Sequence, residues 1–361
     1  MFPGAFVATT PDKPALIVAS TGEVQTYGEL DAAANRLSQL LYGAGLRPGD
    51  HIGICMENHP RYLEVLWGCH YAGLIYTACS SRLTSPELAY ILNDCGARVF
   101  ITSKYKSDQA ADIVADTPGL ALRLMLDGTI DGYESYEDAV ARQTPSPLDN
   151  RIAGADMLYS SGTTGRPKGV TGKFEEKSLI DTPVGVTGLL SMLFGGSADS
   201  VYLSPAPMYH AAPLRFCMAV QALGGTVVMM EHFDPEQYLA LIDRYKTTLS
   251  QVVPTMFIRL IKLPTEVRSK YDVGSMKTIV HAAAPCPIPV KHAIIDWFGP
   301  IVHEYYAGTD MLYSSGTTGR PKGVTGKFEE KSLIDTPVGV TGLLSMLFGG
   351  CLLYTSDAAD E

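Results

Sequence analysis

The chain has 361 residues, of which 46% are hydrophobic and 18% charged, a balance typical of a globular protein rather than a disordered one. This length indicates two or three lobes, each long enough to bury a core. The 28 basic and 38 acidic residues give a net charge of −10, which argues against nucleic acid or an anionic membrane surface as the main partner.

No transmembrane segment is expected, because the longest apolar run, residues 62–79, contains Glu64 and His70 and is too short to span a bilayer. The N-terminus lacks a basic segment followed by an uninterrupted apolar one, so no signal peptide is expected. The seven cysteines are scattered and favour reduced, mostly buried thiols over a disulfide framework or a zinc site. Together these features predict a cytoplasmic protein.

The first part of the chain alternates between short apolar strands and helices. A strand pair is expected within residues 14–30, where Thr26 and Glu29 form a capping box that opens a helix. Further strands and helices are expected, in order, at residues 51–56, 59–72, 74–78, 87–94 and 97–102. The periodicity weakens after residue 102, and we expect the first lobe to end near residue 150.

The second part of the chain repeats this alternation. Strands are expected at residues 156–159, 200–203, 226–230, 249–253, 278–282 and 301–306, and helices at 174–179, 187–194, 214–223, 235–245 and 289–298. The predicted fold class is α/β, with two βαβ-type lobes and mainly parallel sheets, at residues 1–150 and 151–309. Ligands of such sheets bind at the carboxyl ends of the strands, so one site is expected from the loops at 160–169, 204–213, 282–287 and 306–310.

The first of these loops carries the most informative sequence in the chain. Residues 159–170 read YSSGTTGRPKGV, and they offer almost nothing apolar to bury. Glycines allow a ligand to approach the backbone, while hydroxyl groups, backbone N–H groups and two cations supply donors for a polyphosphate. The spacing is not that of a Walker A loop, which excludes kinase and GTPase functions of that type. The alternative is a mobile, solvated loop without a ligand.

The same sequence occurs twice, because residues 310–350 are identical to residues 156–196. Structural repeats diverge and stack as units, so one undiverged copy indicates an aberrant join in the coding sequence. The second copy of the glycine-rich loop, at residues 314–322, is not expected to bind nucleotide because it lacks supporting strands. The final residues 351–361, CLLYTSDAADE, form a tail unrelated to the rest.

At four loops the sequence resembles the superfamily of adenylate-forming (AMP-binding) enzymes. YSSGTTGRPKGV is similar to the phosphate-binding signature of that family, PMYHAAPL at 207–214 to its second motif, HAAAP at 281–285 to its adenine loop, and YYAGTD at 305–310 to its Y-x-x-T-E motif. TYGEL and GLRPGD in the first lobe also match. Within the family, the text from residue 281 onward most resembles fatty-acyl-CoA synthetases (ligases).

The resemblance implies a reaction in which ATP activates a carboxylic acid, expected to be a fatty acid, to an acyl-adenylate whose acyl group is then transferred to coenzyme A. It implies a phosphate cradle made of Ser160, Ser161, Gly162, Thr163, Thr164, Gly165, Arg166 and Lys168. It implies adenine contacts from Ala283, Ala284, Pro285 and Tyr306 and a phosphate contact from Thr309, with Ala307 and Gly308 also binding the nucleotide.

The resemblance also implies catalytic and metal-binding roles. His210 would lie beside the acyl carboxylate, and Lys168 and Thr164 would act on the phosphates. Thr164 and Asp310 would hold Mg²⁺, a hard cation that prefers oxygen ligands. A histidine in a loop more often has only a structural role, and for His210 that alternative stays open.

One departure from the family bears on activity. The family continues beyond its Y-x-x-T-E motif into a hinge and a small C-terminal domain, and neither has a counterpart in this sequence. We therefore expect a truncated, inactive or impaired ligase. Two alternatives are a nucleotide- or acyl-binding fragment without turnover, and an adenylation domain of the peptide-synthetase type.

Overall fold

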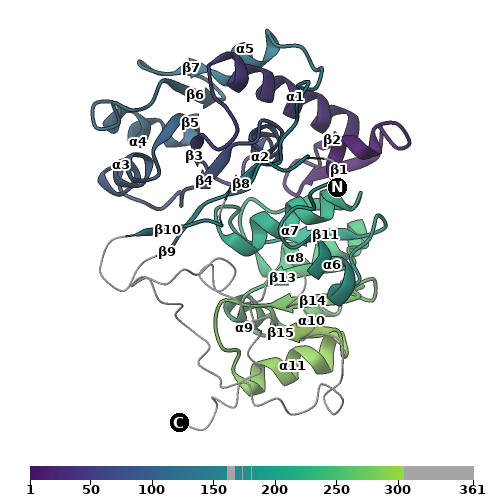
Figure 1. Cartoon of the computed structure of the whole chain (residues 1–361). Helices are drawn as coiled ribbons and strands as arrows, with labels where there is room; N and C mark the ends of the chain where they lie inside the picture. The colour runs from purple at the N-terminus through teal and green to yellow at the C-terminus, as the bar shows by residue number, and fades with distance from the viewer. Residues whose placement is uncertain (161–166, 173, 180, 305–361) are drawn as a thin grey trace, which may run out of the picture.

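A computed structural model describes residues 1–160, 167–172, 174–179 and 181–304 (Figure 1). The predicted fold class is confirmed, because these residues form two mainly parallel sheets with helices on their faces. Three segments lie outside the described residues: the predicted nucleotide-binding motif at 305–310, the duplicate at 310–350 and the tail at 351–361.

The first sheet has the strand order β7-β6-β5-β3-β4-β8, and all its neighbouring strands are parallel. Its strands are β3 (His51–Cys55), β4 (Ile75–Ala78), β5 (Ala97–Ser103), β6 (Leu122–Leu126), β7 (Glu134–Ser135) and β8 (Ala155–Asp156). Its helices are α1 (Tyr27–Gly43), α2 (Tyr62–Tyr71), α3 (Ser85–Asp94), α4 (Ser107–Asp112) and α5 (Tyr136–Ala141). Strand side chains alternate between faces, so Val99 and Ile101 share a core with α1 and α2 while Phe100 packs with α3.

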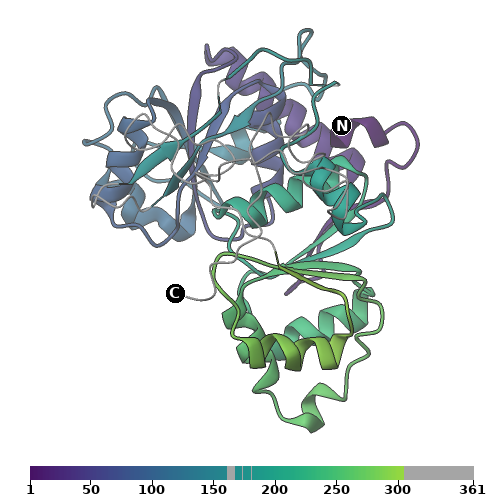
Figure 2. The ribbon, with the colours of Figure 1, turned by 60° about the horizontal axis from the view of Figure 1, so that its bottom comes forward.

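The second sheet has the strand order β15-β14-β13-β11-β12-β1-β2, in which only the β1–β2 pair is antiparallel among the described strands. Its strands are β1 (Pro14–Val18), β2 (Val24–Thr26), β11 (Val201–Ser204), β12 (Thr226–Met229), β13 (Leu249–Val252), β14 (Thr278–His281) and β15 (Val302–Glu304). Figure 2 shows helices on both sides of this sheet. They are α6 (Thr187–Phe194) and α7 (Ala211–Ala222) on one side, and α8 (Pro235–Tyr245), α9 (Pro254–Ile261) and α11 (Ile288–Phe298) on the other.

One apolar core connects the two lobes. Side chains of α1 and α2 belong to the same buried cluster as those of α6 and α7, so α7 lies between the sheets (Figure 1). The remaining short elements are the 3₁₀ helices Pro3–Phe6 and Lys104–Lys106, the helix α10 (Thr265–Arg268), and the hairpin strands β9 (Leu158–Ser160) and β10 (Lys168–Val170).

The N-terminal elements follow the sequence prediction. β1 and β2 form the expected antiparallel pair. The capping box is also confirmed: the Glu29 N–H donates to Thr26 Oγ1 at 3.3 Å, and the Thr26 N–H donates to Glu29 Oε2 at 2.8 Å. This reciprocal pair satisfies two N–H groups that the first turn of α1 cannot bond internally.

The sequence prediction of a helix at residues 174–179 is wrong. The described backbone there lies beside residues 151–153 instead: the Ala153 N–H donates to the Lys177 carbonyl at 2.8 Å, and the Leu179 N–H donates to the Arg151 carbonyl at 3.1 Å. Pairing with a neighbouring segment satisfies these backbone groups and buries Leu179, which a short helix ending before Pro183 would do less well.

The lobe boundary at residue 150 stays a prediction. On each side of it, at least one strand joins the sheet formed mainly by the other side. β1 lies before that residue but pairs with β12 of the second sheet, whereas β8 lies after it and pairs with β4 of the first sheet.

Among the described residues, no helix is long and apolar enough to cross a membrane. The cysteines of the described chain are free thiols, and all but Cys286 are buried.

Candidate active site

The glycine-rich sequence lies at the turn of an antiparallel hairpin, β9–β10, called here the phosphate hairpin (residues 158–170). Ser160 pairs with Lys168 and Tyr159 with Gly169, so Lys168 lies directly across from the residue that enters the loop. A Cβ at Gly169 would lie 2.1 Å from Met157 Cε and 2.9 Å from the Tyr159 ring, so a larger residue there would require both side chains to shift. The predicted phosphate ligands between the strands (161–166) lie outside the described residues and stay predictions.

Helix α3 holds the phosphate hairpin on one side. The Tyr159 hydroxyl donates to Asp94 Oδ2 at 2.6 Å, and the Tyr90 hydroxyl donates to the Pro167 carbonyl at 3.4 Å. Burial and the Asp94 carboxylate raise the pKa of Tyr159, which keeps the hydroxyl protonated as a donor. The two contacts fix Tyr159 on β9 and Pro167, the residue directly before β10.

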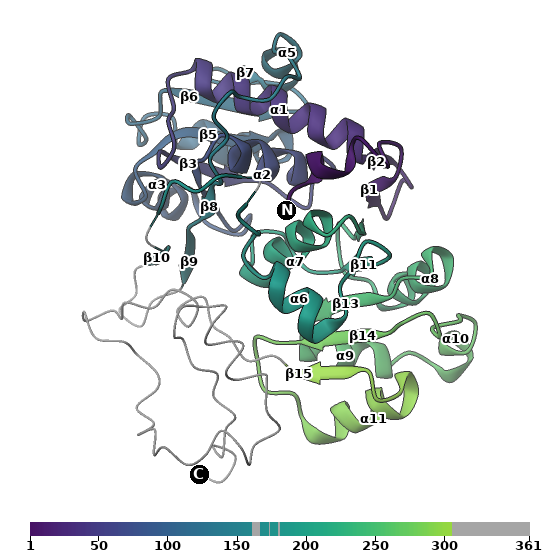
Figure 3. The same ribbon diagram turned by 45° about the vertical axis from the view of Figure 1, so that its right-hand side comes forward.

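A buried ion pair links the base of the phosphate hairpin to the second lobe. Arg215 on α7 donates through Nη2 and Nε to Asp156 Oδ2, at 2.6 and 3.1 Å. The side chains of Arg215 and Asp156 are only 3% and 9% exposed. Asp156 ends β8, and Figure 3 shows β9 following β8 at the edge of the first sheet. The pair therefore sets the hairpin relative to α7.

His210 lies at the N-terminus of that same helix. It is the N-cap residue of α7 and ends a loop that follows β11, called here the His210 loop (residues 204–210). Its exposed ring lies 4.4 Å from the Tyr209 ring, centroid to centroid. Partial desolvation by surrounding atoms, together with the Arg82 charge from the first lobe, lowers the pKa of His210. The imidazole is therefore mainly neutral near pH 7, so one ring nitrogen donates a hydrogen bond and the other accepts one.

The loop after β14 carries the predicted adenine residues. Ala283, Ala284 and Pro285 are exposed, whereas Ala282 and His281 before them are buried. Ala283 has φ of 74°, in the left-handed region that costs an L-residue about 1–2 kcal/mol. Non-glycine residues in such conformations cluster at functional sites, and the exposed backbone beyond the strand is available to a ligand.

The His210 loop and the loop after β14 both lie at the edge of the second sheet that is formed by the carboxyl ends of its parallel strands. β11, β13, β14 and β15 are parallel neighbours, so the loops that follow them leave the sheet on the same side. The structure thus brings the His210 loop and Ala283–Pro285 to a common edge, and the ion pair of α7 links the phosphate hairpin to it. Tyr306, Ala307, Gly308, Thr309 and Asp310 follow β15 and lie outside the described residues.

Three of the residues that hold these loops escaped the sequence analysis. Asp156 and Arg215 are 59 residues apart, and nothing in either local sequence indicates that they pair. Asn58, in the loop after β3, bonds the His210 loop from the first lobe.

In the described part of the chain, no group of three or more His, Cys, Asp or Glu side chains could hold a metal ion. Mg²⁺ binding by Thr164 and Asp310 stays a prediction.

Comparisons with known proteins agree with this architecture. The fold is that of the N-terminal part of acyl-CoA synthetase-like enzymes: an inhibitor-bound N-terminal domain of FACL13 from Mycobacterium tuberculosis superposes with a TM-score of 0.74, covering 86% of this chain and 75% of that one at 22% identity. ATP-bound MatB from Rhodopseudomonas palustris gives 0.70 at 26% identity, covering 86% and 61%.

The sequence comparisons define the family. Residues 5–312 match the model of the AMP-binding enzyme family, and the chain belongs to it. The chain is 33% identical over 276 residues to a feruloyl-CoA synthase of an Amycolatopsis species, covering 76% of this chain and 52% of that protein. It is 32% identical over 286 residues to 4-coumarate–CoA ligase 3 of Arabidopsis thaliana, covering 77% and 50%. The chain spans about half the length of these curated relatives, and the resemblance to adenylate-forming enzymes is confirmed.

Proposed function

We propose that the chain carries the ATP- and acid-binding part of an acid–CoA ligase. The observation that supports this most is the joint placement of the phosphate hairpin and His210, which the Asp156–Arg215 pair connects at 2.6 Å. In the first step a carboxylate oxygen attacks the α-phosphorus of ATP, and pyrophosphate leaves with the electrons of the broken P–O bond. In the second step the thiolate of coenzyme A attacks the acyl carbon, and AMP leaves.

The described residues have distinct roles in this proposal. Lys168 donates to a phosphate oxygen across from the hairpin turn, and a charge-assisted hydrogen bond of this kind is roughly twice as strong as a neutral one. Neutral His210 donates a hydrogen bond to the acid without placing a second full charge in the site. Ala283, Ala284 and Pro285 present backbone and small side chains to adenine. Mg²⁺, held by Thr164 and Asp310, would neutralise phosphate charge.

The class of acid has two candidates. The motif text favours a fatty acid, and the curated relatives, a feruloyl-CoA synthase and 4-coumarate–CoA ligases, favour an aromatic propenoic acid. Val252 and the start of α9 at Pro254 would border the acyl group in either case. Coenzyme A is the proposed acceptor of the acyl group. An adenylation domain of the peptide-synthetase type would activate an amino acid in place of a fatty or aromatic acid.

The test is to incubate the chain with ATP, Mg²⁺, coenzyme A and either dodecanoic or ferulic acid, and to measure acyl-AMP and acyl-CoA by mass spectrometry. We expect acyl-adenylate with one acid class, formed slowly as in the impaired ligase that the sequence predicts, and its loss when ATP is omitted or EDTA is added. Saturable ATP and acid binding without product would support the fragment without turnover. Adenylates formed only from amino acids would support the peptide-synthetase type, and absence of both binding and product would contradict the proposal.

A further inference from the structure

Asn58 connects the two lobes at the candidate site. It lies in the loop after β3 and is buried, with 6% of its surface exposed. Its Nδ2 group donates to the carbonyl of Ala206 at 3.0 Å and to the carbonyl of Met230 at 2.8 Å. Its Oδ1 accepts from the Met208 N–H at 2.7 Å. Both amide donors and the amide oxygen are therefore bonded to backbone of the second lobe.

These partners belong to the loops at the reactive edge of the second sheet. Ala206 and Met208 lie within the His210 loop, and Met230 directly follows β12. Between the two ends of the loop, at residues 205–209, the one backbone–backbone bond among the described residues runs from the His210 N–H to the Pro207 carbonyl at 3.2 Å. Because a buried polar group left without its partner costs about 1–3 kcal/mol, the Asn58 amide contributes much of the energy that selects this loop conformation.

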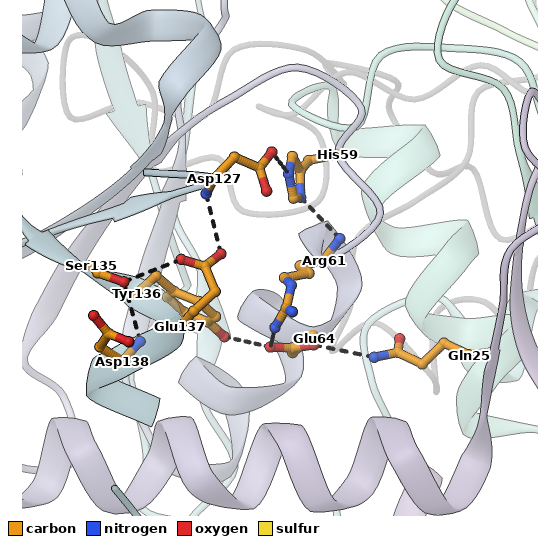
Figure 4. A network of polar contacts seen from close by, with 9 residues as sticks. All are labelled: Gln25, His59, Arg61, Glu64, Asp127, Ser135, Tyr136, Glu137 and Asp138. Carbon is orange, nitrogen blue, oxygen red and sulfur yellow. Dashed lines mark hydrogen bonds and ion pairs between the residues drawn. The ribbon is translucent and has the colours of Figure 1, made fainter. Parts of the chain in front are cut away.

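The next residue, His59, fixes the same segment to the first lobe. Its Nδ1 accepts from the Arg61 N–H at 3.0 Å, which leaves the ring proton on Nε2, and Nε2 donates to Asp127 Oδ2 at 2.8 Å (Figure 4). Asp127 follows β6 in the left-handed region, with φ of 61°, and its N–H donates to Glu137 at 3.1 Å. The loop that contains Asn58 is thus bonded to the first lobe through His59.

The buried carboxylate of Glu64 extends this support. It accepts from the Tyr136 hydroxyl at 2.8 Å and from Gln25 at 3.1 Å, and Arg61 lies 3.5 Å from it (Figure 4). Tyr136 begins α5 and Gln25 belongs to β2, so α2 is tied to both neighbours. The result is a rigid base from which one amide reaches the His210 loop.

We propose that Asn58 is a positioning residue for the activation of the acid: from the first lobe it sets the loop that places His210. This inference rests on the proposed function for the meaning of His210, but the loop placement itself is independent of any ligand. Removing the amide should therefore weaken binding of the acid and leave binding of ATP, which depends on the phosphate hairpin, nearly unchanged.

The test uses Asn58→Ala and Asn58→Asp, with Asn35→Ala as the matched control. Asn35 is also buried, at 2% exposure, but among the described residues its side-chain amide bonds only Asp31 within α1. Asn58→Asp keeps an acceptor for the Met208 N–H while turning an anionic oxygen toward two carbonyl oxygens. Two quantities are measured: hydrogen exchange at the Met208 amide, and the dissociation constants of the acid and of a non-hydrolysable ATP analogue.

For Asn58→Ala, which removes the acceptor, we expect exchange at Met208 to rise about 10-fold or more. For both Asn58 variants we expect the acid to bind about 10-fold more weakly, since losing one such bond costs about 1.4 kcal/mol. ATP affinity should change less than about 2-fold, and Asn35→Ala should change neither quantity. Equal losses for acid and ATP, or unchanged Met208 exchange in Asn58→Ala, would overturn the proposal. If exchange rises but the wild-type chain binds neither acid nor ATP, the proposed function fails and the positioning of the loop stands.

Discussion

The phosphate hairpin and the His210 loop are both held by side chains from neighbouring elements, but by different chemistry. Charged groups hold the hairpin, through Asp156–Arg215 and Tyr159–Asp94, whereas the uncharged amide of Asn58 holds the His210 loop. A buried ion pair is expensive to break from one side, while a neutral amide is insensitive to pH and salt. The placement of the hairpin should therefore respond to charge removal and pH much more than the placement of the loop.

The largest expected effect comes from Arg215→Met. This change leaves the Asp156 carboxylate buried without its partner, and breaking a buried pair in this way costs about 3–5 kcal/mol. Urea denaturation should show a loss of this size in the free energy of unfolding. Hydrogen exchange should rise in β9 and β10 before it rises at Met208.

The double variant Asp156→Leu with Arg215→Met is the control for this prediction. Removing both charges removes the unpaired group, so the double variant should be more stable than Arg215→Met alone. A double variant as unstable as the sum of the two single variants would show that the pair is uncoupled, and the comparison between hairpin and loop would lose its physical basis.

A smaller effect is expected from pH, through a histidine beneath the segment that leads into the hairpin. The Gly154 N–H donates to the His70 carbonyl at 2.9 Å, and the His70 ring is buried with neither ring nitrogen hydrogen-bonded among the described residues. Burial, with a smaller contribution from the N-terminal amine, lowers the pKa of His70 to about 3 from 6.5. The unfolded chain therefore binds a proton below pH 6.5 that the folded chain does not.

The folded protein therefore loses stability as pH falls from 6.5 toward 3. At pH 5.5 the group costs about 1.4 kcal/mol relative to pH 8. His70→Leu removes this cost, so the stability of the variant relative to wild type should improve by that amount between pH 8 and pH 5.5, measured by urea denaturation at both values. An equal pH dependence in the two proteins would contradict a neutral buried His70.

The sequence predicted the fold well because its signals are local. Alternating apolar strands and helices, the capping box at Thr26 and the glycine-rich loop are all encoded in neighbouring residues. It missed contacts between distant segments: Asn58 reaches a carbonyl 148 residues further along, and β1 pairs with β12. The helix expected at 174–179 failed for the same reason, because backbone of residues 151–153 pairs with that segment.

The candidate site was predicted only at its ligand-facing loops. Sequence reasoning proposed Lys168, His210 and Ala283 from their motifs, and their roles in binding stay predictions. The residues that hold these loops have no motif, since a buried asparagine or arginine looks like any other polar residue until its partner is known. That is why Asn58 and the Asp156–Arg215 pair required the structure.

The most direct test of the central claim is a calorimetric titration of ATP with Mg²⁺ into the wild-type chain, Lys168→Met and Lys277→Met. Lys277 is an exposed control that precedes β14 and so lies at the opposite edge of the second sheet. We predict equal binding to wild type and Lys277→Met, and a loss of about 10–100-fold for Lys168→Met, the value of one charge-assisted hydrogen bond. No saturable binding by the wild-type chain, or equal affinity in all three proteins, would contradict the claim that the phosphate hairpin is a nucleotide site.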